Sequence, residues 1–131
     1  MISWKTLYFN FIFANQKRKT KAFIKMEKVI QIIKEELESK GLKILKIILF
    51  GSRARGDFKE DSDWDFFIVV DQDLTFGQKK EILSNIYKKL AEQENKSFEL
   101  IITSEKKFTE MKNYVGTLSY EVDKEGINIW G

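Results

Sequence analysis

The chain reads ILKIILFGS at residues 44–52 and DWDFFIVV at residues 63–70, and these two stretches decide its fold. Each contains an apolar run of strand length, the first ended by Gly51-Ser52 and the second opened by Asp63 and Asp65. Side chains two residues apart on a strand point to the same face. The two carboxylates are therefore expected to project together from the beginning of the second strand.

The chemistry of this segment suits phosphate and metal. Two carboxylates held side by side repel each other unless a cation lies between them, and Mg²⁺ is often held by one or two carboxylates plus substrate phosphates. Gly51 permits close backbone approach, and Ser52 offers a hydroxyl and an N–H to a phosphate oxygen. Arg53 and Arg55 add guanidinium donors. The segment from Gly51 to Asp65 is therefore predicted to bind a nucleoside triphosphate and a metal ion.

Both arginines have a structural alternative. The acids Asp57, Glu60 and Asp61 lie in the loop that follows them and would form surface ion pairs. Such exposed pairs contribute about 0–1 kcal/mol each. A phosphate role is favoured for Arg53, and both interpretations stay open for Arg55.

Length and composition narrow the class of protein. The chain has 131 residues, which suits one domain with a modest core. It has no cysteine and no histidine, so disulfides, thiolate metal sites and imidazole chemistry are excluded. Carboxylates remain as the available metal ligands. The absence of cysteine fits a reducing compartment, and a cytoplasmic location is expected.

The net charge of +3 comes from one end of the chain. Residues 1–25 contain six basic residues and no acid, so the remainder carries three more acids than bases. Direct binding to nucleic acid is therefore not expected. The apolar stretch at 7–14 is too short to span a bilayer, and most of the positive charges follow it, unlike those of a secretory signal. No membrane partner is expected either.

Residues 1–25 are interpreted as an N-terminal extension, with Met26 as the first residue of the folded domain, 26–131. The alternative is an arm that docks on a partner or a second subunit. Within 26–131, strands and helices alternate. Helices are predicted at 26–40, 75–94, 104–113 and 117–125, and strands at 43–50, 64–70, 97–103 and 127–130. A capping box from Thr75 to Gln78 marks the beginning of the second helix.

The link between the first two strands is too short for a parallel crossover, so the sheet is expected to be mixed. The predicted class is α/β (α+β), a small mixed sheet flanked by helices. Glu99 is an isolated charge in the third apolar strand. One interpretation is an edge-strand residue that faces solvent and has no function. The other is a metal ligand, because the site of Asp63 and Asp65 lacks a third ligand and Glu99 is the candidate.

Gly51-Ser52, ten intervening residues and Asp63-x-Asp65 resemble the signature of the DNA polymerase β-like nucleotidyltransferase superfamily. The longer strings FGSRARGD at 50–57 and DSDWD at 61–65 resemble its minimal nucleotidyltransferase family, the antitoxin-type proteins paired with HEPN-domain toxins. The resemblance covers about residues 27–130. It implies that residues 26–131 form a nucleotidyltransferase domain with the polymerase β-like fold.

The resemblance also implies a reaction. Asp63 and Asp65 would ligate Mg²⁺, with two ions expected, and Glu99 aligns with a third carboxylate that is more often Asp. Gly51 and Ser52 would hold the triphosphate. The expected activity is transfer of a nucleoside monophosphate, AMP from ATP, to a hydroxyl, with a tyrosine of a HEPN-type toxin as acceptor.

Two other functions stay open. One is an antitoxin that binds and masks its toxin with little or no catalysis, because Glu99 is one methylene longer than the commoner Asp. The other is an antibiotic-type nucleotidyltransferase acting on a small molecule. Enzymes of that type usually carry a helical substrate domain after the catalytic one, and this chain ends 32 residues after Glu99, which disfavours them.

Overall fold

The computed structural model describes residues 21–59, 61–93 and 97–130, and for 21–24 only the backbone. Four strands form one sheet in the order β3-β2-β1-β4. Their bounds are Ile44–Phe50 for β1, Trp64–Val70 for β2, Phe98–Ser104 for β3 and Ile127–Trp130 for β4. β1 is antiparallel to β2 and to β4, whereas β2 and β3 are parallel. The expected mixed sheet is confirmed.

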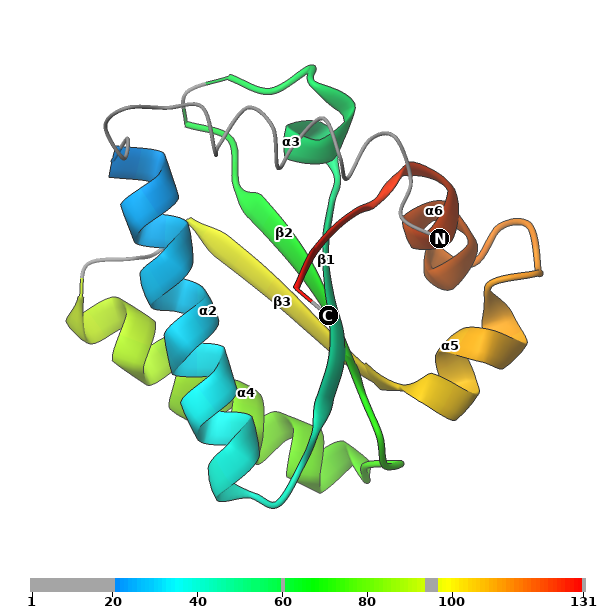
Figure 1. Ribbon diagram of the computed structural model, residues 1–131, viewed down its shortest axis with the longest axis horizontal. Helices are drawn as coiled ribbons and strands as arrows, with labels where there is room; N and C mark the ends of the chain where they lie inside the picture. The colour runs from blue at the N-terminus through cyan, green and yellow to red at the C-terminus, as the bar shows by residue number, and fades with distance from the viewer. Residues whose placement is uncertain (1–20, 60, 94–96, 131) are drawn as a thin grey trace.

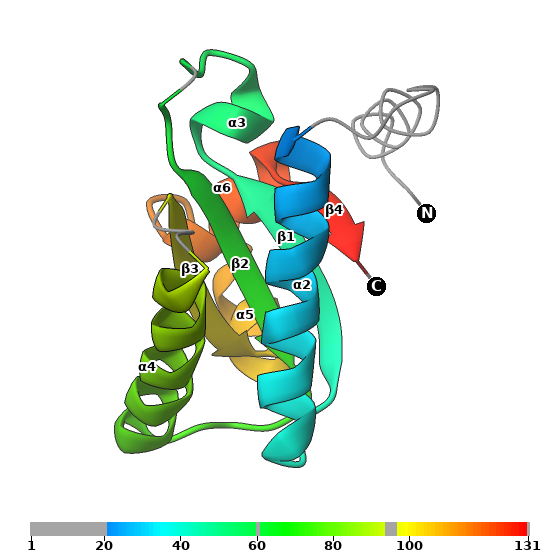
Figure 2. The same ribbon diagram turned by 90° about the vertical axis from the view of Figure 1, so that its left-hand side faces the viewer.

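Helices cover both faces of this sheet (Figures 1 and 2). α2 (Lys21–Ser39) and α4 (Phe76–Glu92) lie on one face, and α5 (Glu105–Met111) and α6 (Leu118–Glu125) lie on the other. α3 (Ser52–Arg55) is a short helical turn directly after β1. Within the described ranges, no helix combines the length and the apolar character needed to cross a membrane.

The central strand β2 is buried on both faces, which explains its nearly continuous apolar sequence. Phe66, Ile68 and Val70 belong to the core cluster under α2 and α4. Phe67 and Val69 belong to a second, smaller cluster with residues of α5 and α6. By the same alternation, the side chain at position 65 projects on the α5/α6 face.

The predicted capping box at the beginning of α4 is confirmed. The Gln78 N–H donates to Thr75 Oγ1 at 3.1 Å, and the Thr75 N–H donates to Gln78 Oε1 at 2.8 Å. The predicted bounds hold to within two residues, with two exceptions. α2 begins at Lys21 and not at Met26, because no glycine or proline interrupts the chain between them. α3 was not predicted, because four residues are too few to produce a helical pattern.

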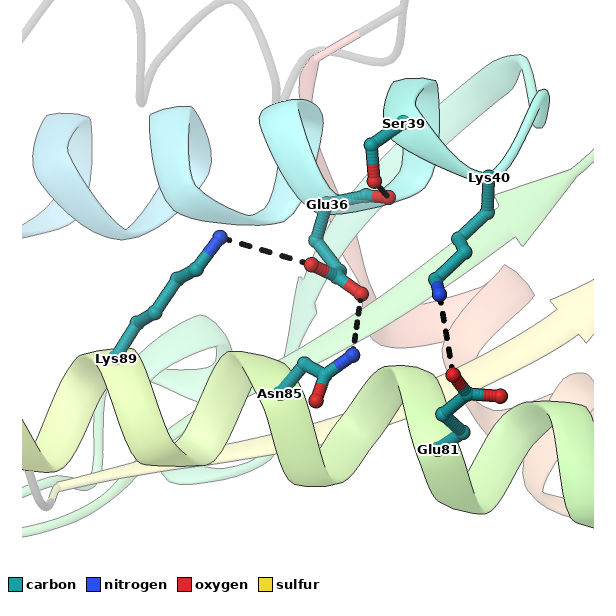
Figure 3. A network of polar contacts seen from close by, with 6 residues as sticks. All are labelled: Glu36, Ser39, Lys40, Glu81, Asn85 and Lys89. Carbon is teal, nitrogen blue, oxygen red and sulfur yellow. Dashed lines mark hydrogen bonds and ion pairs between the residues drawn. The ribbon is translucent and has the colours of Figure 1, made fainter.

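A polar network joins α2 to α4, the two helices that lie on the same face of the sheet (Figure 3). The Glu36 side chain is buried, and Asn85 Nδ2 donates to its Oε1 at 2.8 Å. Lys89 Nζ lies 3.6 Å from the other carboxylate oxygen. Nearer the end of α2, Lys40 Nζ pairs with Glu81 Oε1 at 3.1 Å, where both side chains are exposed. The Glu36 carboxylate thus joins α2 to α4 from a buried position, whereas the Lys40–Glu81 pair, just after the end of α2, lies in solvent.

Because of this difference, Asn85→Ala should lower the free energy of unfolding by about 1–3 kcal/mol, since it removes the amide donor of a buried carboxylate. Lys40→Ala, the matched control, should cost about 0–1 kcal/mol, the usual range for an exposed ion pair. Urea denaturation followed by circular dichroism measures both. Equal effects of the two substitutions would contradict the assignment of Glu36 as the critical contact between α2 and α4.

Candidate active site

The predicted site residues come from three strands and meet at one end of the sheet. Gly51 directly follows β1, Asp65 is the second residue of β2, and Glu99 is the second residue of β3. Asp63 lies in the loop just before β2 and is exposed. The α3 turn marks this end of the molecule in Figures 1 and 2.

The strand register places Asp65 between the other two strands. Asp65 pairs with Glu99 across the parallel β2–β3 ladder and with Phe50 across the antiparallel β1–β2 ladder. Paired residues on neighbouring strands present their side chains on the same face. The carboxyl groups of Asp65 and Glu99 are close enough to share a hydrogen bond. The sequence therefore identified two carboxylates, 34 positions apart, that the sheet brings together.

The electrostatics of this pair are unfavourable in the absence of a cation. The pKa of Asp65 is raised from 3.8 to about 6. Burial is the largest cause, and it is followed by the charge of Glu99, a hydrogen bond with Glu99 and the charge of Asp63. The charge of Arg55 opposes these effects. The charges of Glu99 and Asp63 thus both act on Asp65, and a bound cation would relieve this repulsion.

Gly51 makes the approach of Asp65 possible. Its backbone has φ 74° and ψ −157°, a region occupied almost only by glycine. A Cβ atom at this position would overlap Oδ2 of Asp65. The sequence analysis assigned Gly51 to close approach of a ligand, and the structure adds that the residue must also leave room for the Asp65 carboxylate.

The two arginines differ in their surroundings. Arg55 Nε lies 3.4 Å from Asp57 Oδ1 in an exposed ion pair, and its charge also lowers the pKa of Asp65. Arg53 is partly buried, and its guanidinium lies against the rings of Phe58 and Trp64. The surface-pair interpretation of Arg55 is therefore observed, and its charge remains within reach of the carboxylates.

Tyr87 of α4 is a neighbour of the site that the sequence analysis missed. Its hydroxyl accepts a hydrogen bond from the Leu100 N–H at 2.8 Å, on the outer edge of β3. Burial raises the pKa of Tyr87, the hydrogen bond from Leu100 lowers it, and the charges of Glu99 and Asp65 raise it further. Tyr87 follows the buried Ile86 on the apolar side of the helix, where a tyrosine is ordinarily a packing residue, so no sequence signal indicated that its hydroxyl reaches β3.

The donor set fits a metal that is shared with a nucleotide. In the described part of the chain, no group of three or more His, Cys, Asp or Glu side chains is arranged to hold a metal ion. The pair of Asp65 and Glu99, with Asp63 near it, is of the kind that binds Mg²⁺ together with substrate phosphates. The remaining ligands of such an ion must therefore come from a bound triphosphate or from water.

Two solved toxin–antitoxin structures resemble the fold. A crystal structure of a toxin-antitoxin with AMP-PNP aligns with a TM-score of 0.54 and 22% identity, over 80% of this chain and 72% of the other. A mutant of the toxin-antitoxin MntA-HpeT aligns with a TM-score of 0.53 and 20% identity over the same shares. At these identities the likeness establishes the fold class.

Two curated relatives from Methanocaldococcus jannaschii carry names that assign them, by inference, as protein adenylyltransferases. MJ0604 is 51% identical over 51 residues, which are 38% of this chain and 51% of the relative. MJ0141 is 34% identical over 79 residues, which are 57% of this chain and 75% of the relative. The first match thus spans about half the length of that relative and the second about three quarters.

The four-stranded mixed sheet with helices on both faces places the chain in the fold class of the two toxin–antitoxin structures. More narrowly, the model of the nucleotidyltransferase domain family matches residues 13–122, and the chain belongs to this family. The match includes residues 13–25 of the predicted N-terminal extension. Residues 1–20 lie outside the described residues, so the domain boundary at Met26 stays a prediction.

The raised pKa of Asp65 predicts a pH-dependent stability difference. The pKa of Asp65 is about 6 in the folded protein and 3.8 for an ordinary aspartate, so the folded protein keeps this proton up to a higher pH than the unfolded chain does. The free energy of unfolding therefore falls as pH rises from about 4 to about 6 and stays low above that. Without metal, Asp65→Asn should become progressively more stable than the wild type across this interval.

Urea denaturation of both proteins in EDTA, at several pH values, measures this difference. Asp123→Asn, on the exposed surface of α6, controls for the loss of a carboxylate. A stability difference between Asp65→Asn and the wild type that did not change with pH would show that the pKa of Asp65 is not raised in the folded protein.

Gly51→Ala should destabilise the protein by more than the roughly 1–3 kcal/mol of backbone strain, because the new methyl group also displaces Asp65. Gly116→Ala is the matched control, since Gly116 also has a positive φ, 93°, but nothing lies within 4 Å of an added Cβ. Thermal denaturation compares the two variants. Equal losses would mean that Asp65 moves aside without cost.

Proposed function

We propose that this protein is a Mg²⁺-dependent nucleotidyltransferase that transfers AMP from ATP to a hydroxyl, the acceptor being a tyrosine of a HEPN-type toxin. The observation that carries the proposal is the pairing of Asp65 with Glu99 beside the Gly51-Ser52 turn. The names of the two relatives support a protein acceptor and adenylyl transfer. The fold neighbours, one of them with AMP-PNP, support ATP as donor and a toxin as partner.

Each site residue receives a role in this proposal. Asp65 and Glu99, with Asp63 near them, would hold the metal together with the triphosphate, and two bound Mg²⁺ ions would supply charge stabilisation to the attacking and leaving oxygens. Ser52, through its hydroxyl and N–H, and Arg55, through its guanidinium, bind the triphosphate. Within this arrangement, the close approach of Gly51 to Asp65 keeps the phosphate turn against the carboxylates.

The reaction is an in-line displacement at the α-phosphorus of ATP. The acceptor oxygen forms a bond to this phosphorus as the bond to the pyrophosphate oxygen breaks. Glu99, exposed at the outer strand, is the carboxylate that takes the acceptor proton. Pyrophosphate leaves while held by Ser52 and Arg55.

A macromolecular acceptor agrees with the openness of this end of the sheet. On the α5/α6 face, Phe108 and Val122 cover Phe67 and Val69, whereas Glu99 on the same face is exposed. The exposed Glu99 is therefore accessible to the side chain of an incoming protein.

A second candidate is an antitoxin that masks its toxin with little catalysis. It is favoured by the absence, among the described residues, of a three-carboxylate arrangement that would hold a metal ion. Glu99 in place of the commoner Asp points the same way. In this alternative the same surface binds the toxin, and the nucleotide site is secondary.

In the deciding experiment the protein is incubated with ATP, Mg²⁺ and the HEPN-type toxin expected to be encoded by the gene next to its own. Mass spectrometry of that toxin then measures its modification. One added AMP on a tyrosine is expected, and replacement of Mg²⁺ by chelator should abolish it. Asp63→Asn and Asp65→Asn should each reduce transfer by at least about a hundredfold, since each removes charge stabilisation of the transition state. Neutralised toxin without modification would establish the masking function instead.

The role of Glu99 is tested by a pair of substitutions. Glu99→Gln removes the charge and should reduce transfer by about a hundredfold or more, whereas Glu99→Asp keeps the charge and should retain part of the activity. Single-turnover assays at saturating ATP compare them. A Glu99→Gln variant as fast as the wild type would mean that Glu99 is only a strand residue facing water.

A further inference from the structure

Arg53 is held on several sides by the loop that follows it. Its guanidinium carbon lies 4.4 Å from the centre of the Phe58 ring and 4.5 Å from that of Trp64. In the plane of the guanidinium, Nε and Nη2 both donate to the Ser62 carbonyl oxygen, at 3.3 and 3.0 Å. Stacking and forked donation together use the features that distinguish arginine from lysine.

These contacts fix the residues on either side of Asp63. Ser62 precedes Asp63, and its carbonyl is held by Arg53, while its hydroxyl accepts a hydrogen bond from the Lys59 N–H at 2.8 Å. Trp64 follows Asp63, is 8% exposed, and donates its N–H to the Ser97 carbonyl at 2.8 Å. One guanidinium therefore contacts both chain neighbours of Asp63.

Arg53 is also the residue after Ser52 in the α3 turn. A displacement of its guanidinium would therefore move Asp63 relative to the Gly51-Ser52 turn. We infer that Arg53 is a positioning residue that sets the Asp63 carboxylate against the phosphate-binding turn, and is not itself a ligand of the triphosphate. This inference rests on the proposed function, in which Asp63 holds the metal and the turn holds the triphosphate.

The sequence analysis favoured the opposite role for Arg53, and the two roles have different consequences. A phosphate ligand acts chiefly through its charge, so lysine in its place should preserve much of the binding of ATP. A positioning residue acts through its planar shape, so lysine should fail. The neighbouring Arg55 has the first kind of surroundings, because it is exposed and its ion-pair partner among the described residues, Asp57, is exposed as well.

The test compares Arg53→Lys with Arg55→Lys in the full chain by two measurements. The first is amide hydrogen exchange of the free protein without metal or nucleotide, at the Ser62 and Trp64 N–H groups. Exchange there should be about tenfold faster in Arg53→Lys and unchanged in Arg55→Lys, because among the described contacts it is Arg53 that reaches Ser62 and Trp64. Unchanged protection of the β1 amides confirms that both variants remain folded.

The second measurement is the separation of kcat from KM for ATP. Arg53→Lys should lower kcat by about a hundredfold with little change in KM, since a misplaced ligand costs rate more than ground-state binding. Arg55→Lys should chiefly raise KM. Wild-type exchange in Arg53→Lys, together with a raised KM, would overturn the inference and make Arg53 a phosphate ligand. If the wild type transfers nothing, the proposed function fails, and the exchange measurement still decides whether Arg53 braces the loop.

Discussion

The repulsion between Asp65 and Glu99 is the constraint around which this end of the molecule is built. The parallel register of β2 and β3 makes the two residues neighbours, and the same register buries Phe66 and Leu100 in the main core. A slip by one residue would turn all these apolar side chains to the wrong face. Each large buried apolar side chain is worth about 1.5–3 kcal/mol, so a few of them outweigh the repulsion of two carboxylates.

The turn after β1 is shaped by the same pair. Gly51 has no side chain where Asp65 needs room, and its unusual backbone conformation leads directly into α3. α3 then carries Arg53 back against Trp64, the residue between Asp63 and Asp65. The buried strands fix the positions of Asp65 and Glu99, and the short turn after β1 places Gly51-Ser52 and Arg53 beside Asp63 and Asp65.

Much of this arrangement could be predicted from the sequence, because it depends on local patterns. Apolar runs of strand length located the four strands to within one or two residues, and the Thr75–Gln78 capping box located the beginning of α4. The short link between the first two strands predicted a mixed sheet. The isolated charge of Glu99 in an apolar strand was enough to associate it with Asp63 and Asp65, and the structure pairs it with Asp65.

What could not be predicted depends on contacts between distant residues. The role of Arg53 is set by where Phe58 and Trp64 place their rings, and charge alone suggested a phosphate ligand. Tyr87 fits the apolar stripe of α4 so well that its hydroxyl carried no positional information. The start of α2 was placed too late because the change in composition at Met26 was stronger than any stop signal before it.

The hydroxyl of Tyr87 also decides how the outer strand of the sheet meets other molecules. An outer strand offers unpaired backbone groups to which a foreign segment can add as a further strand. On β3 the Leu100 N–H already donates to Tyr87, so strand addition at this point would first have to expel that hydroxyl. The Glu99 side chain, one residue away, stays exposed. At Leu100 the edge therefore admits an approaching side chain more readily than an approaching backbone.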